Sequence, residues 1–179
     1  MSRLLSEAKA IDGAIYEAIA ASDTPRLDSA MRRLSRAADH SKLWFAVAAA
    51  LALLGGRGGR LAARRGLLSL GIASGFANLL AKPLTTRRRP ARQEAEELAR
   101  RHVQMPRSSS FPSGHSASAF AFATAAGAAQ PSLSASLRIL AMLVGYSRVH
   151  TGVHYPADVL AGALIGVSAA EVAAWTVSD

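Results

Sequence analysis

The chain has 179 residues, of which half are hydrophobic, yet its formal net charge is +9. Apolar and basic residues are therefore segregated along the chain, as in a membrane protein with basic loops. The absence of cysteine excludes a disulfide framework and thiolate metal sites. The aromatic residues do not alternate with the basic ones as they do on a nucleic-acid-binding surface, so we expect no nucleic acid partner.

The N-terminal region, residues 1–39, predicts two amphipathic helices. In residues 4–19 the apolar side chains recur at helical spacing, whereas charged ones such as Asp12 lie largely on other faces. Thr24 and Pro25 are typical of the cap and first turn of a second helix. Because charged residues interrupt this region, it lacks the charged-then-apolar pattern expected of a cleavable signal peptide. We expect both helices to lie on the membrane or to pack on the rest of the chain.

Residues 40–179 contain five apolar segments and are interpreted as a membrane domain. The segments are residues 43–54, 66–81, 116–129, 134–146 and 159–176. Each is shorter or more polar than the roughly 20 apolar residues that a lone spanning helix needs, but their small residues suit close helix packing in lipid. We predict an all-α integral membrane bundle of about five transmembrane helices preceded by the amphipathic helices. A soluble all-α bundle is the alternative.

Lys82, Arg89 and Arg148 are cations close to the ends of these apolar segments. Phosphoryl transfer spreads charge over three equatorial oxygens, so an enzyme has to supply positioned positive charge. Arg contacts phosphate oxygens in pairs and Lys acts as a point charge. We predict a phosphate-binding role for these three, the alternative for Lys82 and Arg89 being an ordinary basic loop. Arg87 and Arg88 are interpreted as ordinary residues of that loop.

The sequence Pro112-Ser113-Gly114-His115 reads as a loop that enters the third apolar segment as a helix. A helix start presents free backbone N–H groups and a positive dipole end, which favour phosphate binding. Gly114 would allow close backbone approach, and His115 would protonate the departing oxygen as a general acid. A plain helix cap is the alternative for so short a motif.

His154 and Asp158 lie four residues apart where a further helix is expected to start. At that spacing the carboxylate would hold the proton on one ring nitrogen and leave the other nitrogen free as a nucleophile, which predicts a phosphohistidine intermediate. A helix-capping contact is the alternative. His150 is given no catalytic role, and His40 and His102 are expected at the surface or at an interface.

Together these residues resemble the three-part signature of the type 2 phosphatidic acid phosphatase (PAP2) superfamily, K-x6-RP, PSGH and SR-x5-H-x3-D, at every signature position. The resemblance implies an all-α membrane fold, shared with glucose-6-phosphatase and the vanadium haloperoxidases, and hydrolysis without metal or cofactor. It implies His154 as nucleophile, Asp158 as its orienting carboxylate and His115 as acid. The phosphate-binding residues that it implies are Lys82, Arg89, Ser113, Gly114 and Arg148.

The partners expected from the resemblance are the bilayer and a lipid phosphate substrate. The substrate classes are polyprenyl phosphates or diphosphates, a polyprenyl-phosphate sugar phosphate such as decaprenylphosphoryl-phosphoribose, phosphatidic acid and phosphatidylglycerol phosphate. A phosphotransferase with the same nucleophile, a haloperoxidase and a non-catalytic membrane scaffold are the alternatives. The sequence does not indicate an oligomeric state.

The distribution of charge predicts the side of the bacterial inner membrane on which the site lies. The expected site-bearing side carries 16 Lys or Arg residues and the opposite side five. By the positive-inside rule the site faces the cytoplasm. Many bacterial members of the superfamily instead have six spans, and many act on the outer face. A mechanism with one neutral and one protonated histidine predicts a rate optimum near the unperturbed His pKa of about 6.5.

Overall fold

Every regular element in the described part of the chain, residues 2–92 and 100–176 of a computed structural model, is helical. The helices are α1 (Ser2–Ala20), α2 (Pro25–Ala37), α3 (Lys42–Leu54), α4 (Gly56–Gly75), α6 (Gly114–Ala129), α7 (Pro131–His150) and α8 (Pro156–Ala174). Short helical turns are η1 (Asp39–Ser41), η2 (Phe76–Ala81) and η3 (Lys82–Leu84). For these residues the predicted all-α class is confirmed, and each predicted apolar segment is helical.

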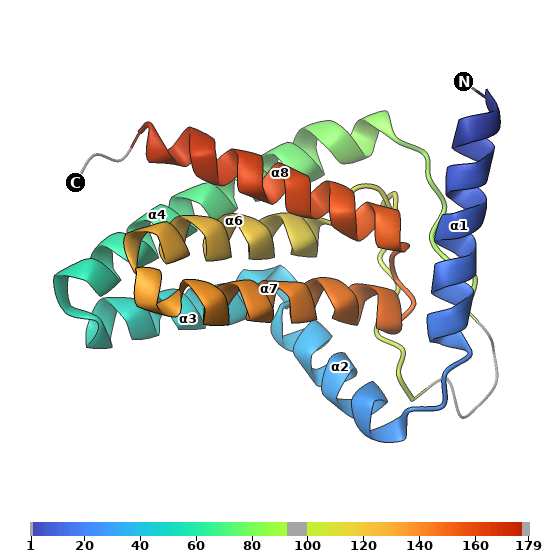
Figure 1. Cartoon of the computed structure of the whole chain (residues 1–179), viewed down its shortest axis with the longest axis horizontal. Coiled ribbons are helices and arrows are strands. Elements are labelled where there is room, and N and C mark those ends of the chain that lie inside the picture. The colour runs from blue at the N-terminus through green and yellow to red at the C-terminus, as the bar shows by residue number, and fades with distance from the viewer. Residues whose placement is uncertain (1, 93–99, 177–179) are drawn as a thin grey trace.

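Helix α6 lies at the centre of the bundle and contacts α4, α7 and α8 (Figure 1). Its packing with α8 depends on two glycines one turn apart, Gly162 and Gly166. A Cβ on Gly162 would collide with the backbone oxygen of Ser113, the cap of α6, and a Cβ on Gly166 would collide with that of Ala117. Such glycine spacing allows two helix backbones to approach closely in lipid. The start of α8 is thereby held against the start of α6, where the Ser113 N–H donates to the backbone oxygen of Asp158.

Two helical stretches of the described residues are long and apolar enough to cross a membrane, namely Gly56–Leu84 and Pro156–Ala174. A third arises if Pro25–Ala37 and Asp39–Leu54, which meet at 62°, form one bent span. The predicted number of about five spans is therefore not confirmed. Helix α6, with 16 residues, is only about 24 Å long, and α7 carries two arginines.

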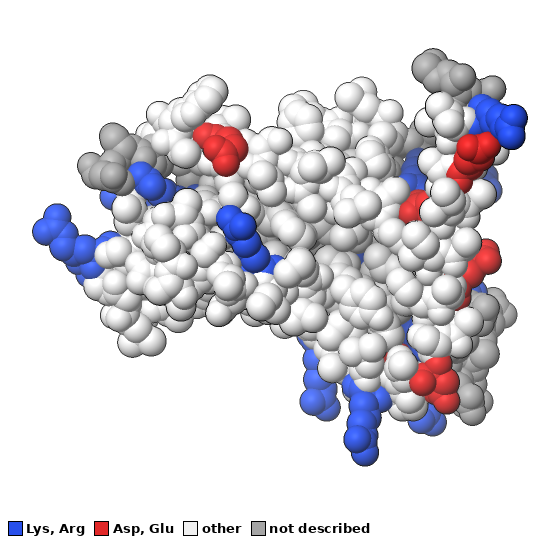
Figure 2. All heavy atoms as spheres, in the orientation of Figure 1, with Lys and Arg blue, Asp and Glu red and all other residues white. Residues whose placement is uncertain are grey.

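The face of the bundle seen in Figure 2 is almost free of charge over α6, α7 and α8, and Lys and Arg gather mainly towards its two ends. Large apolar side chains of α8, such as Leu160 and Leu164, are exposed on the surface. A stretch with few charges between more highly charged ends fits a bilayer.

Helix α1 runs across the end of the bundle where α7 ends and α8 begins (Figure 1). Its apolar Leu4 and Ile11 are 72% and 62% exposed, whereas Asp12 and Tyr16 are buried against the bundle. Leu4 and Ile11 therefore do not pack on the rest of the described chain, and Asp12 and Tyr16 make that contact instead. The division of the chain at residue 40 stays a prediction. Residues 93–99 of the basic connection and 177–179 of the predicted membrane domain lie outside the described residues.

Candidate active site

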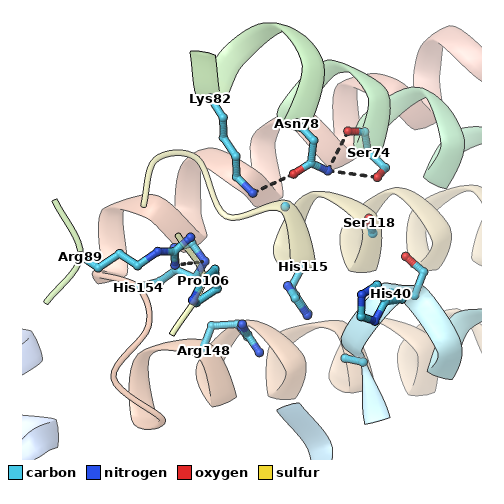
Figure 3. Close-up of a pocket in the computed structure, with 13 residues that line it drawn as sticks. His40, Ser74, Asn78, Lys82, Arg89, Pro106, His115, Ser118, Arg148 and His154 are labelled. Atoms are coloured by element: carbon cyan, nitrogen blue, oxygen red, sulfur yellow. Dashed lines mark hydrogen bonds between the residues drawn. The ribbon is translucent and has the colours of Figure 1, made fainter. Parts of the chain in front are cut away.

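A cavity of about 190 Å³ lies where α7 ends and α6 begins, and six of the eight predicted site residues line it (Figure 3). Its position is fixed by the ends of four helical segments and the loop before α8. The six residues are Lys82, Arg89, Gly114, His115, Arg148 and His154. The fold thus brings all three parts of the motif together.

The buried imidazole of His154 presents its two nitrogens to different partners. Nε2 lies 3.3 Å from Nη1 of Arg89, and Nδ1 lies 3.5 Å from Oδ2 of Asp158. Nδ1 forms no hydrogen bond of standard geometry within the described residues. Burial, the largest cause, lowers the pKa of His154 to about 4, against the opposing effect of Asp158. The ring is therefore neutral at physiological pH, with Nε2 on the side of the cations.

Asp158 makes the helix-capping contact that was the alternative for its spacing, and it also lies beside His154. Oδ2 faces His154 and also accepts the backbone N–H of Tyr155 at 2.9 Å, which caps the start of α8. The carboxylate is fully buried and does not line the cavity. Asp158 therefore lies behind His154, on the side away from the cavity.

The interpretation of Arg87 as an ordinary loop residue is wrong. Its Nη1 donates to Oδ1 of Asp158 at 2.8 Å, and its Nη2 pairs with Asp12 of α1. The guanidinium also lies 4.5 Å from the centroid of the Tyr155 ring. Asp12 in turn accepts the backbone N–H of Ala157 at 2.8 Å. No local pattern distinguishes Arg87 from exposed Arg88, because the contact depends on how α1 packs.

His115 is paired with Asp39, a residue of η1 that the sequence did not single out. Its Nε2 lies 2.9 Å from Oδ1 of Asp39, and Nη1 of Arg148 lies 3.7 Å from the same oxygen. Arg148 is almost fully buried and also donates to Ser35. Asp39 therefore connects the predicted acid to one of the predicted phosphate-binding cations.

Lys82 and Gly114 meet at the top of the cavity through Asn78. The Lys82 ammonium donates to Oδ1 of Asn78 at 2.7 Å. A Cβ on Gly114 would lie 3.0 Å from that oxygen and 3.4 Å from Nζ of Lys82. A side chain at this position would therefore press on Asn78, and glycine leaves room for the close approach. Asn78 is a polar residue inside an apolar segment, which is a signal that the sequence does offer.

The side chain of Ser113 does not line the cavity. Its buried hydroxyl accepts the backbone N–H of Ser116 at 3.3 Å and so caps α6. The capping alternative holds for this side chain. The helix start that it caps, with Gly114 and His115, does line the cavity.

His40 was expected at the surface or at an interface, and it lines the cavity. His150 is hydrogen-bonded to Asp28 at 2.7 Å, and neither His150 nor His102 lines the cavity. Within the described residues no three or more His, Asp or Glu side chains form a group that could hold a metal ion. The predicted metal independence is left to experiment.

The sequence profile of the PAP2 superfamily matches residues 62–179, which include all eight predicted site residues. Decaprenylphosphoryl-5-phosphoribose phosphatase from Mycolicibacterium smegmatis is 32% identical over 167 residues, covering 88% of this chain and 84% of that protein. The bacitracin transport permease protein BcrC from Bacillus licheniformis is 58% identical over 38 residues. That match covers 21% of this chain and only 19% of BcrC.

Two solved structures are similar over almost the whole chain. The transmembrane PAP2-type phosphatidylglycerolphosphate phosphatase from Bacillus subtilis has a TM-score of 0.70 at 26% identity, covering 95% of this chain and 86% of that one. LpxE from Aquifex aeolicus has a TM-score of 0.71 at 24% identity, covering 90% and 93%. The likeness to LpxE is evidence for the fold alone.

Proposed function

Because the chain belongs to the PAP2 superfamily and is a phosphatase of a bacterial membrane, we propose that it hydrolyses a membrane lipid phosphate or diphosphate without a metal. The reaction proceeds through a phosphohistidine intermediate on His154. The observation that carries this proposal is the convergence of three cations and two histidines on one cavity.

In the first step, Nε2 of His154 attacks phosphorus, so that a P–N bond forms and the P–O bond to the leaving group breaks. His115 gives its proton to the departing oxygen. Asp158 holds the proton on Nδ1 of His154 and stabilises the positive charge that develops on the ring. In the second step, water gives a proton to His115 and attacks phosphorus, and the P–N bond breaks to release inorganic phosphate and neutral His154.

The burial of Arg148 supports an anionic ligand in the cavity. The side chain is 1% exposed, and its Nε has no hydrogen-bond partner among the described residues. The carboxylate nearest to it, that of Asp39, is 3.7 Å away and is shared with His115. Burying a charge is costly unless it is paired. A phosphoryl group between Lys82, Arg89 and Arg148 would supply the missing negative charge.

The substrate that we place first is a polyprenyl-phosphate sugar phosphate. The relative that is 32% identical over most of the chain is named for its action on decaprenylphosphoryl-5-phosphoribose. Polyprenyl phosphates or diphosphates, phosphatidic acid and phosphatidylglycerol phosphate are the other classes to be compared with it. We further propose that the site faces the cytoplasm, which the surplus of Lys and Arg on its side of the chain supports.

The proposal is tested with detergent-purified protein in EDTA, by measuring phosphate release from each of these lipid classes. We expect turnover by the wild type and by a His102→Ala control, whose histidine lies outside the cavity, and none by His154→Ala. Equal turnover by His154→Ala, or loss of wild-type turnover in EDTA, contradicts the mechanism. Phosphorylated product that forms only when an acceptor alcohol is added would identify a phosphotransferase. A folded wild type without either activity would favour the scaffold alternative.

A further inference from the structure

The cavity extends beyond the predicted phosphate-binding residues. Four polar residues, which with Asn78 we call the polar end, line this extension: His40, Ser41, Ser74 and Ser118. Figure 3 shows Ser74, Ser118 and His40 on the side of the cavity away from Arg89 and His154. None of these residues belongs to the signature motifs.

A row of polar side chains leads from the phosphate-binding residues to the polar end. Ser74, Asn78 and Lys82 follow one another at intervals of four residues, so they share one face of a helical stretch. Asn78 donates to the backbone oxygen of Ser74 at 2.9 Å and to its hydroxyl at 3.2 Å. The row lies inside Gly56–Leu84, one of the two stretches apolar enough to span a membrane. Polar groups inside a span commonly mark the path or binding site of a substrate.

Three side chains of the polar end have no hydrogen-bond partner within the described residues. They are the Ser118 hydroxyl, the Ser41 hydroxyl and the His40 imidazole. Ser118 is 5% exposed and lies one turn after Gly114 on the alanine-rich helix α6. The Ser118 hydroxyl opens onto the cavity, so its hydrogen-bond partner has to come from there. Its position on the cavity allows a ligand to be that partner.

The backbone of η1 is strained where it presents these side chains. His40 and Ser41 have φ values of 53° and 60°, a left-handed conformation that residues other than glycine rarely adopt. Two such residues in succession persist only where the surrounding structure enforces them, and they are common at ligand sites. Here the contact between Asp39 and His115 ties η1 to α6. The contact of Asp39 with His115, the predicted acid, therefore also holds His40 and Ser41 at the cavity.

We propose that the polar end binds the hydroxyl groups of a sugar that carries the phosphate to be removed, so that the substrate is a lipid-linked sugar phosphate. This inference rests on the proposed phosphatase function. Sugar hydroxyls both donate and accept hydrogen bonds, which matches serine hydroxyls, an amide and an imidazole. A prenyl phosphate would instead place hydrocarbon next to its phosphate, and phosphatidic acid a glycerol whose other two oxygens are esterified. Neither offers a free hydroxyl to these polar groups. A site built to bind hydroxyl groups discriminates strongly against such analogues.

The test compares a polyprenyl-phosphoryl-5-phosphoribose with a polyprenyl monophosphate of the same chain length. We expect the wild type to favour the sugar phosphate by at least about tenfold in kcat/KM. The Ser118→Ala and His40→Ala variants should each lower that ratio by about threefold to tenfold, since each removes one hydrogen bond. Exposed Ser136 on α7 lies outside the cavity, so Ser136→Ala is the matched control and should leave the ratio as it is.

Two results would overturn the inference while the phosphatase function stands. One is turnover of both lipids, dependent on His154, with a wild-type ratio near one. The other is an unchanged ratio in both Ser118→Ala and His40→Ala. Failure of the wild type to release phosphate from any lipid would overturn the proposed function and this inference together. Because His40 is exposed, its variant keeps the test decisive even if Ser118→Ala does not fold.

Discussion

Arg87 donates a hydrogen bond to the buried carboxylate of Asp158 across 2.8 Å, and it pairs with Asp12 of α1 at the same time. The carboxylate predicted to orient His154 is thus held from outside its own helix. Its two oxygens have separate tasks, since Oδ1 binds Arg87 and Oδ2 faces His154. The N-terminal helix, which the family profile does not cover, is therefore connected to the candidate nucleophile through Asp12, Arg87 and Asp158.

The first prediction concerns Arg87. Arg87→Gln should lower kcat by about 10- to 100-fold with little change in KM, because groups that hold a ligating or catalytic side chain have effects of that size. The neighbouring Arg88→Gln is the matched control, because Arg88 is exposed. In an Asp158→Asn background the Arg87→Gln change should lower kcat little further, because the contact of Arg87 with His154 through the Asp158 carboxylate is already lost. Steady-state kinetics are measured for the wild type and these variants, and an equal effect of Arg87→Gln in both backgrounds contradicts the relationship.

The sequence predicted those features that depend on neighbouring residues. Apolar segments became helices, Pro156 starts α8, and local motifs supplied six residues of one cavity. Contacts between distant segments left no such pattern. Arg87 and Arg88 are identical in type and adjacent, and only the packing of α1 separates their roles. Asp39 likewise reaches His115 because of the 62° bend between α2 and α3.

Hydropathy does not confirm the predicted number of spans, for a related reason. Helix α6 is short and rich in alanine and glycine because it is enclosed by its neighbours, so its composition reports contact with protein more than contact with lipid. Polar residues inside apolar segments point towards the site. Ser74 and Asn78 interrupt one segment, and both line the cavity.

A second prediction follows from the close approach at Gly114. Gly114→Ala should lower kcat/KM by on the order of tenfold or more, because its methyl group would displace Asn78 and the Lys82 ammonium. Gly71→Ala is the control, since a Cβ there meets nothing within 4 Å. The control should keep its activity and gain up to about 1 kcal/mol of stability from the better helix propensity of alanine. Equal activity of the two variants would show that the approach at Gly114 is not needed.

The third prediction is the pH dependence of the rate. Two unperturbed histidines predict an optimum near pH 6.5, but burial lowers the pKa of His154 to about 4. His154 therefore stays neutral and nucleophilic well below pH 6.5. We expect the acid limb of kcat/KM at about pH 4, once the substrate's own ionisation near pH 6 is accounted for. An enzyme-derived acid limb at pH 6.5 would contradict a buried nucleophile.

The same shift predicts how stability changes with pH, which is the fourth prediction. Between about pH 6.5 and pH 4, His154 binds more protons in the unfolded chain than in the native one. The free energy of unfolding should therefore fall as pH falls through this window. The His154→Ala variant lacks this contribution and should lose less stability over the same window. Denaturant titrations in detergent at pH 7 and pH 4.5 measure the difference, and parallel losses would contradict it.

The last prediction is the side of the membrane that the cavity faces. The sequence contains no cysteine, so an introduced one is unique. Gln104 is exposed and lies two residues before Pro106, which lines the cavity. Exposed Ser132 lies at the far end of α7, about 24 Å along the helix from Arg148. In intact cells the Gln104→Cys variant should react only with a membrane-permeant thiol reagent, and Ser132→Cys should also react with an impermeant one.

The reverse pattern would place the site on the outer face. It would show that the positive-inside rule fails here, with 16 basic residues on the translocated side. A substrate supplied from the cytoplasm could then reach His154 only after crossing the bilayer, so the labelling result also limits where the substrate is made.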